Sequence, residues 1–301
     1  NWLAYYNLGV LFQKYSEYKN SIHNYKLSIK YNSNNYASHN NLGNVYQELG
    51  YYELASKHLA HTINLNPKFV GAYSNYLYCL NFIESFDQKI YFKIASKFTS
   101  NLETINFDRK KEQILKKEKI NLGFVSGDFG IHPVSFYLVK LIELINKKKF
   151  CTYAYSNSNK NDLMTNKLKK NFNNWRQINK INDKEVLNQI QNDRIDILID
   201  LSGHTGKNRL SIFARRAAPI QITWLGFNAS TGLKEMDYII VDPYVFKNEH
   251  KGNFSEKAII LPDTFQCIYL NDKVKIKPKK QTNVVFGNFS KLSKINDNVI
   301  V

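Results

Sequence analysis

A repeat of 34 residues runs without a gap through the first part of the chain. Segments that recur at a fixed period of about 20 to 50 residues are small structural units that bury their apolar faces only by stacking on their neighbours. Small residues and bulky apolar residues keep separate places in this repeat, which predicts closely packed antiparallel helix pairs. The matching positions are Leu8 and Leu42, Gly9 and Gly43, Phe12 and Tyr46, Ser21 and Ala55, and Tyr25 and Leu59.

The order of these residues resembles the tetratricopeptide (TPR) pattern, and a third, degenerate copy follows at Tyr73, Tyr76 and Leu80. Such arrays usually hold an extended peptide on their concave face, so we expect docking of substrate proteins; the alternative is a spacer. Residues 2–12 lack the polar face of a capping repeat, so we expect further repeats before residue 1. The motifs are Tyr5-x-x-Leu8-Gly9-x-x-Phe12, His39-x-x-Leu42-Gly43-x-x-Tyr46, Ala55-x-x-x-Leu59 and Pro67.

The second part of the chain alternates short apolar runs with helical patterns. One more amphipathic helix is predicted between residues 82 and 100, and the charged, irregular stretch 101–119 marks the domain boundary. Alternating strands and helices predict a parallel sheet of Rossmann type, whose ligands lie beyond the carboxyl ends of the strands. Strands are predicted at 119–125, 150–155, 195–201, 219–224, 238–241, 258–261 and 284–286, and helices at 134–145 and 183–191.

Pairs of glycines follow three of these predicted strands: Gly127 and Gly130, Gly203 and Gly206, and Gly226 and Gly232. Glycine permits a positive φ and a close backbone approach to a ligand, whereas the alternative is ordinary loop glycine. Because the carboxyl ends of parallel strands share one edge of a sheet, these loops predict a binding site there.

Two histidines, His132 and His204, lie in the same loops. Histidine titrates at about pH 6.5 and can therefore take a proton from a hydroxyl nucleophile at working pH, although a lone histidine can also be purely structural. Pro133 after His132 suits the first position of a helix. No third His, Cys or carboxylate has metal-like spacing with them, so no metal is expected.

Composition limits the compartment and the partners. The formal charge of +17 comes mainly from lysine, since only six of the 42 basic residues are Arg, and we expect a solvated basic surface rather than a nucleic-acid site. A polyanion or an anionic membrane stays the alternative. The three cysteines have no CxxC spacing, and the start shows no signal or transit peptide. No apolar run reaches the length of a transmembrane helix. We expect a cytoplasmic location.

Five sequence blocks resemble the catalytic region of the O-linked N-acetylglucosamine transferase and SPINDLY family. The resemblance implies a protein O-glycosyltransferase that inverts the sugar, uses a nucleotide sugar as substrate and needs no metal or other cofactor. It implies the first half of a GT-B fold, two facing Rossmann-like domains, preceded by an all-α TPR solenoid. The blocks are SGDFGIHP at 126–133, IDILIDLSGHTGKNRL at 195–210, FARRAAPIQITWLG at 213–226, MDYIIVDP at 236–243 and LPDTFQC at 261–267.

Site residues follow by matching these motifs. The resemblance implies that His132 is the active-site histidine, as a base or a positioning group, and that Gly203, His204 and Thr205 line the donor site. It also implies that Lys294, in the block FGNFSKLSKI at 286–295, contacts the donor phosphates. Asp128, Ser230 and Thr231 are expected to line the cleft, although the segment 227–232 departs from the Pro-Gly loop common in relatives. Ser290 and Lys291 stand where relatives usually have amides.

The resulting domain plan has TPR repeats at 1–85, a linker helix and irregular segment at 86–118, a catalytic half at 119–282 and the start of a second half at 283–301. Because most of the second half would follow residue 301, we expect this piece alone to be inactive. The leading hypothesis is transfer of N-acetylglucosamine from UDP-N-acetylglucosamine to Ser or Thr of proteins. The alternatives are a SPINDLY-like O-fucosyltransferase that uses GDP-fucose, and a TPR peptide-binding module or pseudoenzyme without transferase activity.

Overall fold

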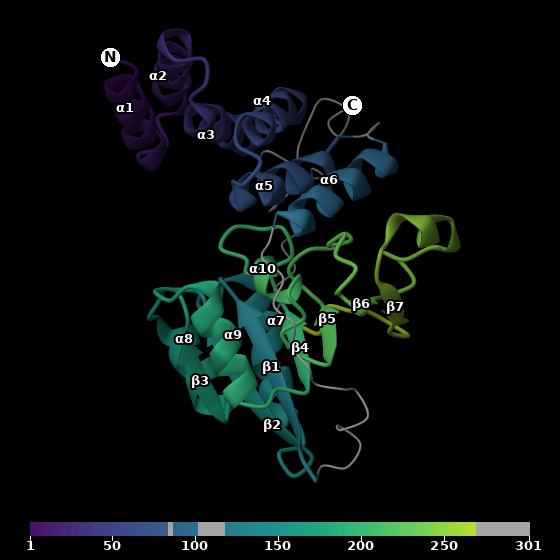
Figure 1. Cartoon of the computed structure of the whole chain (residues 1–301). Coiled ribbons are helices and arrows are strands. Elements are labelled where there is room, and N and C mark those ends of the chain that lie inside the picture. Colours follow the sequence, from purple (N-terminus) through teal and green to yellow (C-terminus); the bar gives the residue numbers. More distant parts are fainter. Residues whose placement is uncertain (84–86, 102–117, 269–301) are drawn as a thin grey trace, which may run out of the picture. The chain divides into compact units, whose positions relative to one another are not determined.

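The computed structural model describes residues 1–83, 87–101 and 118–268 (Figure 1). The chain separates into two compact units, with the division between Phe86 and Asp87. The predicted strand at 284–286, the segment 283–301 with Lys294, and residues Ser290 and Lys291 lie outside the described residues. The four predicted domain ranges stay predictions.

The first unit is an array of antiparallel helices, as the repeat predicts. Its helices are α1 (Trp2–Lys14), α2 (Tyr18–Tyr31), α3 (Tyr36–Glu48), α4 (Tyr52–Leu65) and α5 (Val70–Leu80). Each repeat packs a glycine of one helix against a bulky side chain of the next. A Cβ atom added to Gly9 would lie 2.6 Å from the Tyr25 ring, and one added to Gly43 would lie 2.8 Å from Cγ of Leu59. The two contacts are 34-residue equivalents, which explains the period.

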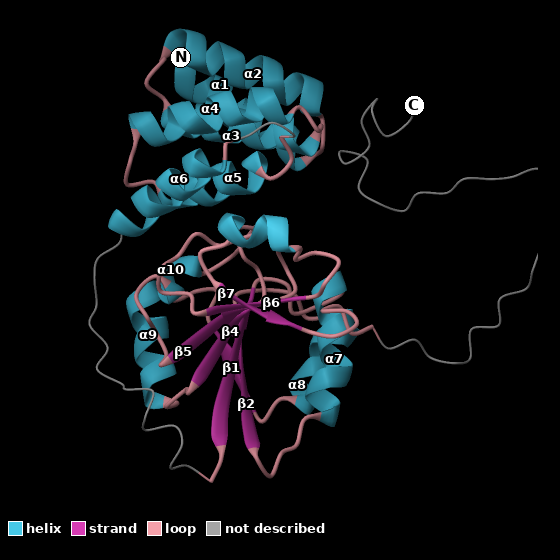
Figure 2. Cartoon of the chain, turned by 90° about the vertical axis from the view of Figure 1, so that its right-hand side faces the viewer, coloured by secondary structure: helices cyan, strands magenta, loops and turns pink. Residues whose placement is uncertain are grey.

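The second unit contains a parallel sheet with the strand order β3-β2-β1-β4-β5-β6-β7. The first six strands have the order of a doubly wound Rossmann fold, which confirms the predicted fold class. Figure 2 shows α7 and α8 on one side of the sheet and α9 on the other. The strands are β1 (Ile120–Ser126), β2 (Phe150–Ser156), β3 (Asn174–Gln177), β4 (Ile197–Asp200), β5 (Ile220–Thr223), β6 (Tyr238–Val241) and β7 (Lys257–Ile260).

The helices of this unit are α6 (Gln88–Ser100), α7 (Pro133–Leu144), α8 (Leu163–Asn171), α9 (Asp183–Asn192) and α10 (Leu210–Phe213), with a 3-10 turn at Asn248–Asn253. Six strands and the helices α6, α7 and α9 agree with the sequence prediction, whereas β3, α8 and α10 were not predicted. The physical reason is weak patterning: β3 is a four-residue edge strand without a fully buried residue, and α8 buries only Thr165 and Leu168. Within the described residues, no helix is both long and apolar enough to cross a membrane.

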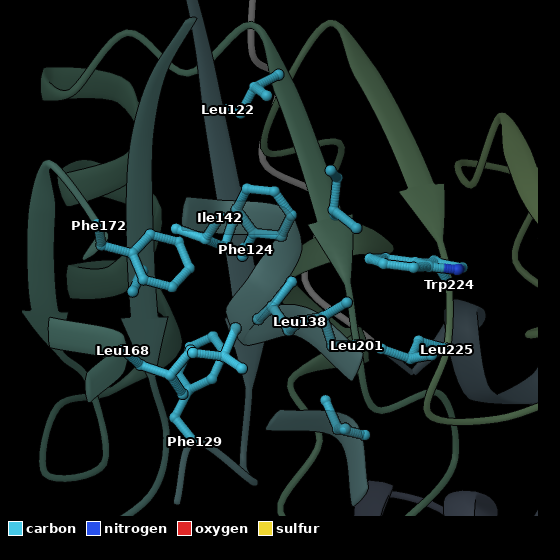
Figure 3. Close-up of a cluster of buried hydrophobic side chains, with 14 of the residues drawn as sticks. Leu122, Phe124, Phe129, Leu138, Ile142, Leu168, Phe172, Leu201, Trp224 and Leu225 are labelled. Carbon is cyan, nitrogen blue, oxygen red and sulfur yellow. The ribbon is translucent and has the colours of Figure 1, made fainter. Parts of the chain in front are cut away.

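The core of the second unit lies between the sheet and α7. Figure 3 shows Phe124 of β1, Leu138 and Ile142 of α7, and the rings of Phe129 and Phe172 gathered there. Phe129 comes from the loop after β1, is fully buried, and lies 5.9 Å from Phe172 between ring centroids. Burial of a phenylalanine side chain contributes about 1.5–3 kcal/mol, so the core itself holds this loop in place.

Candidate active site

The loops that follow β1 and β4 meet at the carboxyl edge of the sheet. These strands are neighbours, but the chain leaves them toward opposite ends of the sheet, which makes their boundary the switch point where doubly wound folds bind ligands. The backbone N–H of Gly127, after β1, donates to Oγ of Ser202, after β4, over 3.4 Å. A Cβ atom on Gly127 would lie 2.8 Å from the carbonyl oxygen of Lys207, so glycine is required for this approach.

His132 caps helix α7 and remains accessible. Its backbone is extended, its Nδ1 accepts the N–H of Val134 over 3.4 Å, and Pro133 takes the first helical position. The proton of the neutral ring therefore lies on Nε2, which is 3.9 Å from Oδ1 of Asp128. The side chains of His132 and Asp128 are 38% and 20% exposed. An incoming hydroxyl can thus reach both groups.

Buried polar contacts fix the loop that carries His132. The Ser135 hydroxyl is fully buried; it donates to the Asp128 carbonyl over 3.0 Å and accepts the N–H of Gly130 over 3.2 Å. The Asp162 carboxylate accepts the N–H of Ile131 over 2.8 Å, and this bond is the largest cause that lowers the pKa of Asp162. Together with Phe129, these contacts hold the loop at both ends.

Asp200, the last residue of β4, organises the second turn. Its fully buried carboxylate accepts the N–H of Ser202 over 3.1 Å, the N–H of Gly203 over 2.8 Å and the hydroxyl of Thr223 over 3.0 Å. Burial raises the pKa of Asp200 to about 6 despite these donors. Gly203 has a φ of +54°, and a Cβ atom there would lie 2.3 Å from Cβ of Phe227, so only glycine fits. The Thr205 hydroxyl turns back to the Ser202 carbonyl over 2.7 Å.

His204 is directed inward. Its ring is 2% exposed, and its Nε2–H donates to the Thr231 carbonyl over 2.8 Å. Tyr91, Phe98 and Phe227 surround it edge-on, with ring centroids 5.7 to 6.5 Å away. This burial lowers the pKa of His204 to about 4, so the ring is neutral at neutral pH. A direct contact between His204 and the donor stays a prediction; the structure shows it joining the turn after β4 to the segment 227–232.

Ser230 and Thr231, expected to line the cleft, are instead buried at 2% and 0% exposure. Their hydroxyls both bond to Glu256, which also accepts the N–H of Thr231 over 2.7 Å. Because both hydroxyls donate hydrogen bonds to the buried Glu256 carboxylate, they hold the segment 227–232 and do not face open solvent in this structure. The predicted site residues therefore divide into Asp128 and His132 at the accessible loop, Gly203 and Thr205 at the adjacent turn, and buried residues behind them.

Sequence reasoning missed Asp200, Glu256, Asp162 and Tyr91. An acidic residue in the apolar run 195–201 was a usable signal for Asp200, because a carboxylate that ends a buried strand needs local donors. Glu256 gave no comparable signal, since its partners lie 25 and 26 residues earlier in the chain. Among the described residues, no three His, Cys, Asp or Glu side chains are grouped so that they could hold a metal ion.

A doubly wound parallel sheet with glycine-bearing turns at its switch point defines the Rossmann-like class of α/β domain. The family model for Glycosyl transferase family 41 matches residues 78–301, well over half of the chain. The chain therefore belongs to glycosyltransferase family 41.

Three known proteins show how far the similarity extends. The probable UDP-N-acetylglucosamine--peptide N-acetylglucosaminyltransferase SPINDLY of Petunia hybrida is 31% identical over 251 residues, covering 79% of this chain and 27% of that protein. SPINDLY of Arabidopsis thaliana is 30% identical over 249 residues, covering 78% of this chain and 27% of that protein. A solved structure of a mutant O-GlcNAc transferase from Thermobaculum terrenum matches 100% of this chain and 58% of its own, with a TM-score of 0.88 and 27% identity. The chain spans about a quarter of the length of the curated relatives.

Proposed function

We propose that the full-length protein transfers N-acetylglucosamine from UDP-N-acetylglucosamine to Ser or Thr hydroxyls of proteins, with inversion at the sugar. Family membership and the names of the relatives support a sugar transferase of this type. The observation that carries the proposal is the meeting of the His132 loop and the Gly203 turn at the switch point of the sheet. The two SPINDLY relatives are named for N-acetylglucosamine, so we do not propose the GDP-fucose alternative.

In the proposed reaction, the acceptor oxygen bonds to the anomeric carbon while the bond from that carbon to the diphosphate breaks. We propose that the Asp128 carboxylate accepts the hydroxyl proton, because Nε2 of the neutral His132 ring already carries one. Nδ1 of His132 accepts a helix N–H, which favours a role in which Nε2–H orients a substrate oxygen. Lys294 is proposed to neutralise the leaving diphosphate, so the mechanism calls for no metal. The helical repeats are proposed to hold the acceptor protein.

Labelled-sugar transfer by the full-length protein tests this proposal. We expect incorporation from UDP-N-acetylglucosamine, little from GDP-fucose, and no loss of rate when EDTA is added. His132→Ala should abolish most transfer. Absence of transfer from both donors would favour the peptide-binding module, and transfer unaffected by His132→Ala would refute the proposed site. A protein that ends at residue 301 is the control that we expect to be inactive.

A further inference from the structure

Helix α6 is fastened directly to the segment behind the site. It buries Tyr91, Ile94, Ala95 and Phe98, one face of the helix, within the second unit. The Tyr91 hydroxyl donates to the Ser230 carbonyl, and Tyr91 is 1% exposed. The sequence pattern predicted only a linker helix here, but these contacts give α6 a place in the packing around the candidate site.

Helix α6 packs closely against this segment at Gly232. Gly232 has a φ of +69°, and a Cβ atom there would lie 2.3 Å from Cβ of Ala95. One helical turn further on, the Phe98 ring packs edge-on against His204, with the centroids 6.2 Å apart. Ala95 therefore determines how closely the helix approaches the segment. Tyr91 contacts the segment, and Phe98 contacts His204.

The same segment is held from its other side by Glu256. The carboxylate accepts hydrogen bonds from the Ser230 hydroxyl over 2.7 Å and from the Thr231 N–H over 2.7 Å, so it holds two consecutive residues. The Thr231 carbonyl then accepts Nε2–H of His204 over 2.8 Å. An unbroken series of contacts thus runs from Tyr91 through Ser230 and Thr231 to His204, beside the Gly203 turn.

We propose that Tyr91 is a positioning residue of the catalytic unit. By donating to the Ser230 carbonyl, it places the Thr231 carbonyl where it holds His204, and so keeps the Gly203 turn against the His132 loop. The effect on catalysis rests on the proposed function, whereas the effect on His204 does not. The role follows from geometry, because removal of the Tyr91 hydroxyl leaves a buried carbonyl without this donor.

The test compares Tyr91→Phe with Tyr25→Phe in the full-length protein. Tyr25 is the matched control, because it is fully buried and its hydroxyl donates to Oε1 of Gln13 over 2.8 Å, in the other unit. The first readout is the nuclear magnetic resonance signal of the His204 Nε2–H, which burial and the bond to Thr231 should protect from exchange with water. We expect Tyr91→Phe to shift or broaden this signal and Tyr25→Phe to leave it unchanged.

The second readout is sugar transfer. Displacement of a catalytic group by about 1 Å can cost about 100-fold in rate. We expect Tyr91→Phe to lower kcat/KM about 10- to 100-fold at a thermal midpoint no lower than that of Tyr25→Phe. Ala95→Val, which pushes α6 away from Gly232, should change the His204 signal in the same way. An unchanged His204 signal in both α6 variants would overturn the proposal, whether or not the protein transfers sugar. If no protein, including the wild type, transfers sugar while the α6 variants still change the His204 signal, only the proposed function is refuted.

Discussion

At the scale of single residues, His132 combines two tasks that one substitution can separate. Its Nδ1 closes the amino end of α7, and its Nε2 is the nitrogen on the side of Asp128. Asparagine is among the best residues at the amino-terminal cap of a helix, whereas alanine has no side-chain acceptor for the helix N–H groups. The two tasks therefore predict different results for the two replacements.

We expect His132→Asn to keep the thermal midpoint of the wild-type protein and to lose about 100-fold in transfer rate, the usual cost of a mispositioned substrate. His132→Ala should lose the same activity and about 1 kcal/mol of stability in addition. Rate assays and thermal unfolding of both variants check this. A His132→Asn protein with near-normal rate would show that the ring acts only as a helix cap.

His204 makes stability depend on pH. The pKa of the His204 ring is lowered from 6.5 in the free side chain to about 4 in the folded protein. Between these two pH values the ring is protonated in the unfolded chain and neutral in the folded one. The stability contributed by the neutral ring is therefore complete above pH 6.5 and is lost as the pH falls toward 4, by about 3 kcal/mol in all.

Urea unfolding at pH 7 and pH 5 should show this loss for the wild-type protein and a smaller one for His204→Gln. The raised pKa of Asp200 acts in the opposite direction, but both proteins contain it, so the comparison between them removes its effect. The pKa of His39 is also lowered to about 4, by burial and by the neighbouring His61 and His58. Both proteins contain His39, so its contribution to the pH dependence of stability cancels in the comparison. Equal pH dependence in the two proteins would contradict the assignment.

At the scale of helices, the repeat glycine Gly43 can be tested against Gly71, a helical glycine outside the repeat pattern. Gly43 lies where a Cβ atom would be 2.8 Å from Leu59, whereas the nearest atom at Gly71, in α5, is 3.5 Å away. We expect Gly43→Ala to destabilise the repeat unit by about 1–3 kcal/mol through overpacking. Gly71→Ala should be neutral or stabilise by up to about 1 kcal/mol, since alanine favours a helix. Circular dichroism during thermal unfolding separates the two outcomes, and equal midpoints would disprove the packing argument.

The same scale shows what could be predicted from the sequence. The 34-residue period and the apolar strand runs reflect local burial patterns, so they revealed the helical array and six strands. The edge strand β3 has no such pattern. The His132 and His204 loops could be predicted to meet because parallel topology sends their strands to one edge. The inward direction of His204 could not, since it depends on Tyr91 and Thr231, which are distant in the chain.

At the scale of the whole molecule, the two units are stabilised by different kinds of contact. The helical unit is built from repeated local contacts, and the sheet unit from crossovers between distant strands. A charge of +17 spread over such a surface does not by itself indicate a nucleic acid partner, and the absence of one stays a prediction, as does the cytoplasmic location. Membership of glycosyltransferase family 41 instead supports the sugar transfer proposed above.

The position of α6 has a practical consequence for anyone who divides this protein. A shortened protein that starts at the first strand, near residue 119, would lose the aromatic wall formed by Tyr91 and Phe98. Water would then reach the His204 imidazole, and the segment ending at Gly232 would lose its contacts with α6 and keep those with Glu256. Such a fragment could keep its sheet and still be a poor guide to the intact protein, so its first residue should lie before Asp87.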